Sequence, residues 1–409
     1  MRAACWQVQG ASGLRIILTN TLFPPVIKGG AEVSTFNLGK ALVGRGHEVH
    51  VVTVVPDRES VAHEHGMVVH RIQPRLVDYP FDKPDRGALR KLGYHAVENY
   101  NPLMRARLRP IMEAVRPQIV HTNIMQLLTC GVWSAAKDAG AKVVHNLRDY
   151  WLLCARSGYF RGEDPCSRKC LDCALVTRPR RSRTADVDGV VAVGQYVLDT
   201  HLEAGLFPNA KVARAILSAT APVEAIAGRA PDRTGVTIGY IGRIKEAKGL
   251  RVLLQAMAKV PAGVPVRLLV AGDGEAGYMD EMRALGDART TFLGWCKAED
   301  LYHQVDLVVV PSLYPEPLPR SILEAYRYDL PVIAARSGGI PEVVASGRSG
   351  WLYEGRDSDE LARLIAALPG PQGLAALDNT ARDQIVSRTD PDYVVDAYEA
   401  VYRDVLTAA

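Results

Sequence analysis

The sequence predicts an α/β protein of two domains, each built on a parallel sheet with helices on both faces. Short apolar segments typical of buried strands alternate with helical segments along the first half of the chain. The same alternation begins again after residue 234. Such alternation is typical of parallel sheets covered on both faces. With 409 residues the chain is also too long for one ordinary core.

In the first half, a short buried strand is followed by a glycine-containing loop and by a helix at 31–45, which Gly46 closes. Pro56 ends the second strand, because proline cannot donate to a sheet. The expected strands of this half are 15–19, 47–55, 118–122, 142–146 and 189–193.

The second half repeats the pattern, with a helix at 249–260 after its first strand. Its expected strands are 235–242, 266–271, 290–294, 307–310 and 331–335. Residues 219–234 are rich in Ala, Pro and Gly and lack periodicity, so we expect the linker there. The predicted domains are therefore 1–218 and 219–390. A final helix at 391–409 carries one apolar face, formed by Tyr393, Val394, Tyr398, Val401, Tyr402 and Val405.

Composition excludes several classes of protein. Hydrophobic residues make up 48% and charged residues 23%, and no apolar run approaches the ~20 residues of a membrane span. The start of the chain, 1–13, lacks the apolar core of a secretory signal. A net charge of +4 is too small and too dispersed to indicate nucleic-acid binding. Seven cysteines, four of them clustered, favour a reducing compartment, so we expect a cytoplasmic protein.

Two carboxylates follow the expected strand at 307–310. Prolines at 315, 317 and 319 hold Glu316 in extended backbone, because proline disfavours helix in the residue before it. A helix can begin only around 319–321, which places Glu324 on its first turns. Both lie at the carboxyl end of a strand, where α/β sheets bind ligands. Since carboxylates accept hydrogen bonds from hydroxyls, the pattern suits a nucleotide-sugar site.

With this Glu-x7-Glu motif and its two α/β halves, the chain resembles the family 4 glycosyltransferases over nearly its whole length. Segment 242–249 is similar to the family's donor-phosphate segment, and 271–274 and 292–295 to the two loops that flank the nucleoside. The resemblance implies the GT-B fold: two Rossmann-like domains facing a cleft, with the last helix crossing back to the N-terminal domain. It also implies retaining transfer of a hexose-like sugar from a nucleoside-diphosphate sugar, in polysaccharide or glycoconjugate biosynthesis.

The resemblance assigns roles to individual residues. Glu316 would bond the donor sugar, while Arg243 and Lys248 would face the diphosphate as the other catalytic residues. Their charges suit a leaving group that gains negative charge, without a catalytic metal. Gly29 and Gly30 precede a helix whose amino end can approach phosphate or sugar. The expected donor-binding residues are Gly29, Gly30, Gly242, Gly272, Gly274, Trp295, Leu318, Pro319 and Glu324, the last on the ribose. A Gly338-Gly339 turn ahead of Pro341 is a further family feature at the cleft.

The chain departs from the family pattern at two places in its first half. Many relatives have histidine before an aspartate where this chain has Arg148 and Asp149, which we expect on the acceptor side. His145 lies inside the expected strand, where a core histidine is the expected role. Gly194 stands where relatives often have serine.

Four cysteines form the pattern C-x11-C-x3-C-x2-C: Cys154, Cys166, Cys170 and Cys173. Four thiolates can close a tetrahedral shell around structural zinc or, less favourably, hold an iron–sulfur cluster, and such a shell leaves no open catalytic position. The insert around them, about 150–183, is polar and expected to be loop-like. Four reduced thiols remain the alternative. Cys5, Cys130 and Cys296 are expected to be isolated thiols.

The acceptor implied by the resemblance is a glycan or a lipid-linked sugar. A basic patch could dock peripherally on the inner face of a membrane, or be an ordinary solvated surface. It comprises the run 178–183 with Arg86, Arg90, Lys91, Arg105, Arg107 and Arg109, beside Leu89, Leu92 and Leu103.

Two other functions remain open. One is a non-catalytic sugar-nucleotide or nucleic-acid binding protein with a four-cysteine interaction module. The other is a GT-B epimerase or phosphorylase, although no lysine motif for a pyridoxal cofactor is recognisable.

Overall fold

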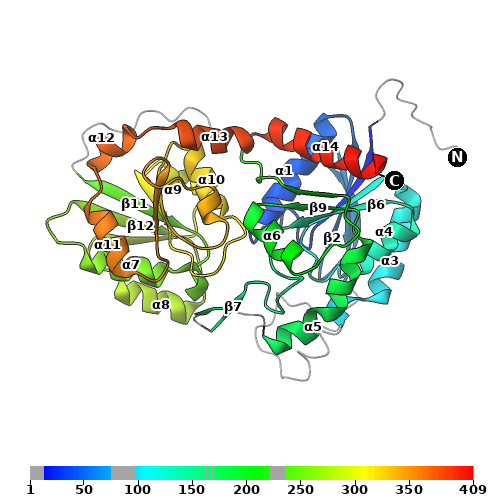
Figure 1. The fold of residues 1–409 in the computed structure, drawn as a ribbon, viewed down its shortest axis with the longest axis horizontal. Helices are drawn as coiled ribbons and strands as arrows, with labels where there is room; N and C mark the ends of the chain where they lie inside the picture. The colour runs from blue at the N-terminus through cyan, green and yellow to red at the C-terminus, as the bar shows by residue number, and fades with distance from the viewer. Residues whose placement is uncertain (1–12, 75–96, 163, 167–169, 222–234, 409) are drawn as a thin grey trace.

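A computed structural model describes residues 13–74, 97–162, 164–166, 170–221 and 235–408. Two sheets, each with helices packed on it, form two domains that lie side by side (Figure 1). The predicted two-domain α/β architecture is therefore confirmed. Residues 222–234 fall in the expected linker, so the boundary at 218/219 stays a prediction.

The sheet of the first domain has the order β10-β9-β6-β5-β1-β2-β4-β3. Its strands pair in parallel except for β3, which forms an antiparallel edge against β4. The strands are β1 (Arg15–Thr19), β2 (Glu48–Val54), β3 (Ser60–Glu64), β4 (Met67–Ile72), β5 (Ile119–Thr122), β6 (Lys142–Leu147), β9 (Gly189–Ala192) and β10 (Val212–Ala215).

Helices cover both faces of this sheet. Trp133 is fully buried in the larger core, on the face covered by the helices 102–115 and 131–138. The helices are α1 (Gly30–Gly44), α3 (Pro102–Val115), α4 (Gly131–Asp138), α5 (Leu171–Ser182) and α6 (Gln195–Glu203).

The second sheet is wholly parallel, with the order β13-β12-β11-β14-β15-β16. Its strands are β11 (Val236–Ile241), β12 (Val266–Ala271), β13 (Thr290–Gly294), β14 (Leu307–Val310), β15 (Val332–Ala335) and β16 (Gly350–Tyr353). The helices are α7 (Leu250–Lys259), α8 (Ala276–Leu285), α9 (Ala298–Tyr302), α10 (Arg320–Arg327), α11 (Ser358–Ala366), α12 (Gly370–Ala375) and α13 (Thr380–Arg388).

Both sheets reverse their strand order beside their first strand. In the second sheet β11 lies between β12 and β14, and in the first β1 lies between β2 and β5. Doubly wound sheets bind ligands outside the carboxyl ends of the strands at such a switch point. This topology therefore directs attention to the ends of β11 and β14.

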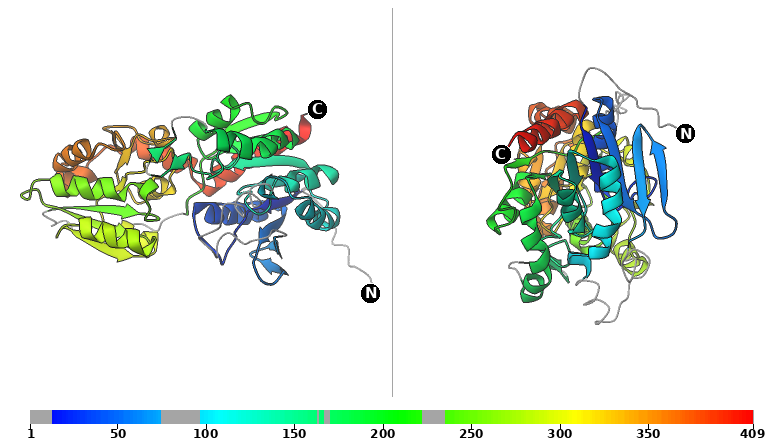
Figure 2. Two further views of the ribbon diagram at one scale, coloured as in Figure 1. Left: turned by 90° about the horizontal axis from the view of Figure 1, so that it is seen from below. Right: turned by 90° about the vertical axis from the view of Figure 1, so that its right-hand side faces the viewer.

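The last helix, α14 (Pro391–Thr407), crosses back to the first domain, as the family resemblance implied (Figures 1 and 2). The hydroxyl of its Tyr402 lies 2.6 Å from Nδ1 of His121 on β5. Five residues of the predicted apolar face lie in a core shared with β1, β2 and β9: Val394, Tyr398, Val401, Tyr402 and Val405. Tyr393 of that face is instead 53% exposed, and Val395 is buried in its place.

The insert differs from the expected loop. It contains a short hairpin of β7 (Phe160–Arg161) and β8 (Asp164–Pro165), and its second part forms helix α5. Among the described residues no helix has the length and apolar character needed to cross a membrane.

Candidate active site

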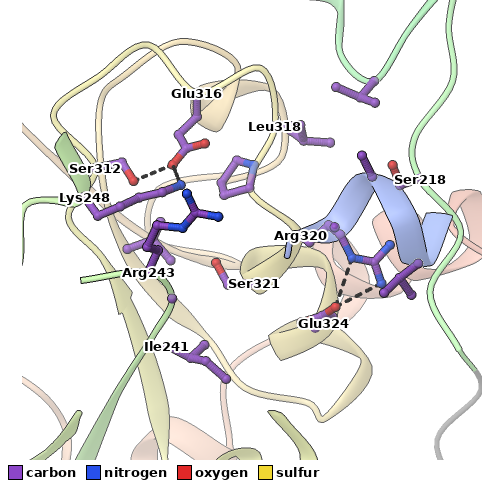
Figure 3. A pocket seen from close by; sticks show the side chains of 18 of the residues that line it. Ser218, Ile241, Arg243, Lys248, Ser312, Glu316, Leu318, Arg320, Ser321 and Glu324 are labelled. Carbon is purple, nitrogen blue, oxygen red and sulfur yellow. Dashed lines mark hydrogen bonds and ion pairs between the residues drawn. The ribbon is translucent and has the colours of Figure 1, made fainter. Parts of the chain in front are cut away.

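A cavity of about 480 Å³ lies between the two domains, within the range of small-molecule sites. It is bounded by the carboxyl ends of β11 and β14, by the loop into α10 and by the start of α1 (Figure 3). The structure brings these predicted residues together in its lining: Gly29, Gly30, Arg148, Gly242, Arg243, Lys248, Glu316, Leu318, Pro319 and Glu324. Asp149, Gly272, Gly274 and Trp295 are not among the lining residues.

Glu316 is almost completely enclosed, with 3% of its surface exposed. Its Oε1 accepts hydrogen bonds from Lys248 Nζ and Ser312 Oγ, both at 2.6 Å (Figure 3), and its other oxygen accepts one from the Tyr314 hydroxyl. Burial first, and the negative charge of Glu316 second, raise the pKa of Tyr314, so the phenol keeps its proton and donates. The carboxylate thus holds Lys248 in the cavity, and its predicted contact with a sugar hydroxyl stays a prediction.

The Gly338-Gly339 turn supports the backbone of Glu316. The amide of Gly339 donates to the Glu316 carbonyl at 2.8 Å. A Cβ at Gly338 would lie 2.3 Å from that oxygen, and its φ of +56° also favours glycine. The close approach of this turn to the backbone of Glu316 therefore explains why glycines stand here.

Three cations gather where β11 ends: Arg243, Lys245 and Lys248. Burial, followed by the charges of Lys248 and Arg243, lowers the pKa of Lys245. Only the backbone carbonyl of Lys28 accepts from Arg243, at 3.0 Å, so this guanidinium has no carboxylate partner among the described residues. An anion bound here would relieve the mutual repulsion. Lys245 was missed, although it lies in the segment that drew attention to its neighbours.

Gly272 and Gly274 have a packing role in this structure. A Cβ at Gly272 would lie 1.9 Å from the Gly242 carbonyl oxygen, and one at Gly274 would lie 2.1 Å from that of Ile244. The two glycines thus let the loop after β12 lie against the loop after β11. Trp295 is 78% exposed and lies outside the cavity lining.

Glu324 belongs to a second polar cluster on α10. Its Oε1 accepts from Arg320 Nε at 3.1 Å and Nη2 at 3.0 Å (Figure 3). Its Oε2 accepts from the Tyr302 hydroxyl at 3.1 Å. Arg320 also donates through Nη1 to Ser34 of α1 at 2.8 Å and to the Ala219 carbonyl at 3.2 Å. Arg320 therefore joins the domains. No sequence pattern indicated this role of Arg320, because Ser34 and Ala219 lie far from it along the chain.

The start of α1 faces the same cluster. A Cβ at Gly30 would lie 2.1 Å from Cδ of Arg320, so the glycine makes room for that side chain. The amide of Gly29 donates to Oε2 of Glu32 at 2.7 Å, and burial raises the pKa of Glu32. The Gly29 amide, which we expected to face phosphate or sugar, therefore already donates to Glu32. The predicted contact of Gly29 with the donor stays a prediction.

Arg148 forms the wall of the cavity on the side of the first domain. It donates to Asn123 Oδ1 at 2.9 Å and to Ser218 Oγ at 3.2 Å. Asp149 instead accepts from the Trp151 amide at 2.8 Å, and burial raises its pKa to about 6. His145 is the expected core histidine: its Nδ1 lies 2.8 Å from Thr122 Oγ1, and burial lowers its pKa to about 3.

A contact across the domains explains Gly194. Glu342 of the second domain accepts from the first two amides of α6, those of Gln195 at 2.7 Å and Tyr196. A Cβ at Gly194 would lie 3.0 Å from both Glu342 Oε2 and the Pro317 carbonyl oxygen. A carboxylate at a helix amino terminus is stabilising. Sequence reasoning missed Glu342, although it follows the Gly-Gly-Ile-Pro segment that had been singled out.

The four clustered cysteines come together in space. Sγ of Cys154 and Cys173 are 4.0 Å apart, and both residues are buried. Sγ of Cys170, a carboxylate oxygen of Asp172 and Sγ of Cys173 all lie within 4.8 Å of one another. Cys166 lies close enough to Cys154 and Cys170 for their charges, after the larger effect of burial, to raise its pKa. Elsewhere Cys130 is buried in the core, Cys296 is partly exposed, and Cys5 lies outside the described residues.

The structure corrects the expected basic surface at 178–183 only in part, because Arg178 and Arg183 are exposed. Arg180 is fully buried, with its guanidinium 4.4 Å from the Trp151 ring, and Arg183 lies over Tyr100. Three other arginines of the patch form ion pairs, Arg105 with Asp138, Arg107 with Glu59 and Arg109 with Glu113, while Leu103 is exposed. Arg86, Leu89, Arg90, Lys91 and Leu92 lie outside the described residues.

Comparison with known proteins assigns a family to each half. Residues 28–214 match the model described as Glycosyltransferase Family 4, and residues 235–369 match Glycosyl transferases group 1. The chain is 29% identical over 331 residues to an uncharacterized 42.6 kDa protein in the cps region of Klebsiella pneumoniae, covering 81% of this chain and 87% of that protein. A D-inositol 3-phosphate glycosyltransferase of Mycobacterium marinum is 37% identical over 184 residues, covering 41% of this chain and 38% of that enzyme.

Solved structures agree with the two-domain fold. Sucrose-phosphate synthase of Thermosynechococcus elongatus has a TM-score of 0.75 at 22% identity, covering 96% of this chain and 99% of that one. Anabaena HepE, in complex with UDP and glucose, has a TM-score of 0.67 at 21% identity, with coverage of 95% and 98%. At such identities the likeness shows the GT-B fold alone.

Proposed function

The chain belongs to the family 4 glycosyltransferases, and we propose that it is a retaining enzyme that moves a sugar from a nucleoside-diphosphate sugar to a glycan or lipid-linked acceptor. The observation that carries this proposal is the group of Arg243, Lys245 and Lys248 at the end of β11, in a cavity between the domains. A group of three cations, of which Arg243 has no carboxylate partner among the described residues, suits a diphosphate, and the bound UDP and glucose of HepE support the same donor class.

In the proposed reaction the acceptor hydroxyl oxygen forms a bond to the anomeric carbon while the bond from that carbon to the diphosphate oxygen breaks. The hydroxyl proton goes to a diphosphate oxygen, on the face from which the leaving group departs, so the configuration is retained. Arg243, Lys245 and Lys248 stabilise the charge that develops on the diphosphate. Glu316 fixes the position of Lys248 through the 2.6 Å ion pair. Its carboxylate already accepts three hydrogen bonds, which does not suit it to act as a nucleophile.

We propose that transfer needs no divalent cation, because three side-chain cations already face the expected diphosphate position. The four cysteines are proposed to hold one structural zinc ion outside the cavity. On the acceptor side, Arg148 and Ser218 of the first domain line the cavity. The relative in a cps region supports a role in polysaccharide synthesis. A lipid-linked acceptor would bring the enzyme to a membrane face.

A thermal-shift screen of uridine, guanosine and adenosine diphosphates and their sugars tests the donor class, because a ligand that binds the folded state raises the melting temperature. The stabilised pair is then assayed for release of the nucleoside diphosphate with candidate acceptors. The anomeric proton of the product, observed by NMR, gives the configuration. Binding without release under every acceptor condition would favour the non-catalytic alternative, and an inverted product would overturn the retaining mechanism.

Arg243→Ala is the test variant, and Arg283→Ala is its matched control. Arg243 faces the cavity, whereas Arg283 pairs with Asp280 on the exposed side of α8. The proposal requires that Arg243→Ala reduce the nucleotide-induced shift at a given ligand concentration while Arg283→Ala preserves it. Equal shifts in both variants would exclude the cationic group as the diphosphate site.

A further inference from the structure

The cysteine insert leaves the first domain and reaches the second. It begins just after Asp149 at the cavity side, and Phe160 of β7 packs against the core of the second domain. Four residues later, Oδ1 of Asp164 lies 2.8 Å from a guanidinium nitrogen of Arg356, which follows β16. In Figure 1 the β7 hairpin lies beneath the second domain while α5 stays with the first. The insert therefore spans the domains at a place other than the cavity and other than α14.

Residues 150–154 of the insert are buried in the core of the first domain, but packing gives the part from 155 to the start of α5 little stability. Its strands have two residues each, and α5 exposes 84% of Leu171 and 71% of Leu175 to solvent. A short polar segment without its own apolar core needs a cross-link or a metal to hold one conformation. The buried thiols of Cys154 and Cys173 lie where the start of the insert meets α5, which is a suitable place for such a cross-link.

The separation of two of the sulfurs fits a tetrahedral metal shell. With zinc–sulfur bonds of about 2.3 Å, two ligands of a regular tetrahedron have sulfurs about 3.8 Å apart. The Cys154–Cys173 separation of 4.0 Å is close to this value, and far too long for a disulfide bond. Cys170 lies within 4.8 Å of Cys173, so a small closing movement brings it into the shell. The amide of Cys166, the proposed fourth ligand, donates to the Tyr159 carbonyl at 2.7 Å, which fixes the backbone of this cysteine within the insert.

We propose that one zinc ion bound by Cys154, Cys166, Cys170 and Cys173 makes the insert a brace between the two domains. This rests on the structural zinc of the proposed function and adds what the ion does. The ion ties the start of the insert to α5, and Phe160 and Asp164 then carry that fixed position to the second domain. The ion touches no substrate, so its loss changes the separation of the domains and leaves the cation group on β11 intact.

The cluster is also connected to the cavity wall. Arg180 of α5 donates to the Cys154 carbonyl at 3.0 Å and lies over the ring of Trp151, whose amide donates to Asp149. Asp149 and Tyr150 directly follow Arg148, which lines the cavity, and Tyr150 lies near enough to Glu316 and Glu342 for their charges to act on its phenol. Removing the ion would therefore loosen the acceptor side of the cavity through α5 and 149–151.

Metal content is the first test. Full-length protein purified without chelator is analysed for zinc and iron, beside Cys166→Ser/Cys170→Ser and the control Cys296→Ser, whose thiol lies in the second domain. These two ligands are the less buried ones, so their replacement is the milder change. About one zinc per chain in the wild type and the control, and less than about 0.2 in the double variant, is expected. Less than about 0.2 zinc in the wild type, or iron with acid-labile sulfide, would overturn the zinc site.

The brace itself needs a structural readout that does not depend on turnover. Small-angle scattering gives the radius of gyration of the wild type, of the zinc-free double variant, and of Phe160→Ala, which keeps all four ligands. Arg336→Ala is the matched control for Arg356→Ala, because Arg336 pairs with Glu354 inside the second domain. The double variant, Phe160→Ala and Arg356→Ala should shift to a larger radius, while Arg336→Ala should not.

The affinity for nucleoside diphosphate should stay within about twofold of the wild-type value in all of these variants. In the zinc-free variant kcat/KM for transfer should fall at least about fivefold, because small misplacements of the reacting groups are costly. An unchanged radius in the zinc-free variant, with an unchanged kcat/KM, would rule out the brace. If no transfer is found in any protein, the metal and scattering results still decide this inference, so its failure and that of the proposed function are distinguishable.

Discussion

The ammonium group of Lys248 lies 2.6 Å from Oε1 of Glu316, although the two residues come from loops that follow different strands of the second sheet. Lys248 ends the short 3-10 turn at Glu246–Lys248 before α7, and Glu316 lies between β14 and α10. The carboxylate is buried and the ammonium reaches the cavity. The pair thus connects the two edges of the switch point and sets the position of a cation that faces the expected diphosphate.

Replacing Glu316 by alanine should lower turnover at least about tenfold, since ~1.4 kcal/mol of lost transition-state stabilisation already has this effect. Nucleoside diphosphate affinity should persist, because Arg243 and Lys245 remain. Steady-state kinetics and calorimetric titration measure the two quantities. Glu354→Ala, at an exposed ion pair of the same domain, is the control. Wild-type turnover in Glu316→Ala would remove Glu316 from the active site.

Lys245→Ala and Arg243→Ala should each weaken nucleoside diphosphate binding about tenfold, which corresponds to ~1.4 kcal/mol. The wild-type affinity should also fall as salt is raised, because the attraction between charges is screened. Titrations at two salt concentrations check both statements. Lys245 makes the sharper test, since the sequence did not single it out. An affinity that is insensitive to its loss would place the diphosphate elsewhere.

Glu342→Ala should destabilise the arrangement of the two domains, because it removes the cap that α6 receives from the second domain. Losing a helix cap costs about 0.5–2 kcal/mol. Asp357 makes a comparable cap for α11 inside the second domain, accepting from Glu360 at 2.7 Å, so Asp357→Ala is a matched control. Thermal unfolding should show a similar loss in both variants, whereas kcat/KM should fall only in Glu342→Ala. Equal kinetics in the two variants would argue against a cross-domain role.

The stability of the first domain should decline as pH falls below about 6.5. Burial lowers the pKa of His121 and His145 to about 3 and that of His201 to about 4, below the ordinary value of 6.5. The unfolded chain therefore binds more protons than the folded one in this window, which makes unfolding easier as pH drops. Asp149, with a raised pKa, has the opposite effect between about pH 4 and 6. Urea unfolding at pH 7.5, 6.5 and 5 gives the free energy of unfolding at each pH. This free energy should decrease less steeply with falling pH in His145→Asn than in the wild type. Equal slopes would contradict the prediction, and any loss of zinc at low pH affects both proteins alike.

Brief exposure to EDTA should leave transfer unchanged as long as zinc stays bound to the cysteines. The measurement pairs the initial rate with the zinc content of the same sample. A loss of activity at full zinc occupancy, restored by added magnesium, would show that the diphosphate requires a divalent cation.

The sequence was sufficient for the fold where strands are buried on both faces. The predicted bounds of β12, β13 and β14 agree with the structure, because the apolar runs there end at glycine or proline. Four strands at or next to sheet edges, β3, β4, β10 and β16, were missed, since polar residues interrupt the apolar run in the first three and β16 is short and begins with glycine. Helix α5 was also missed: its sequence contains Pro179 and three arginines, and its conformation depends on the burial of Arg180 against Trp151.

The site was predictable only where motifs are local in sequence. Arg243, Lys248, Glu316 and Glu324 lie in two short segments, and the structure places all of them in one cavity. The roles of residues whose hydrogen-bond partners are distant in the sequence could not be predicted. Arg320 bonds Ser34, which is 286 positions away, and no pattern along the chain connects them.

Helix α14 has a consequence for the order in which the protein can be made. Its apolar face completes the core around β1, so the first domain is assembled from both ends of the described chain. During synthesis that domain stays open until α14 has left the ribosome, long after its own strands have been translated, and its uncovered apolar surface is then exposed to aggregation. A fragment that stops after β10 should therefore be poorly soluble when expressed alone, and a separately supplied α14 peptide should rescue it.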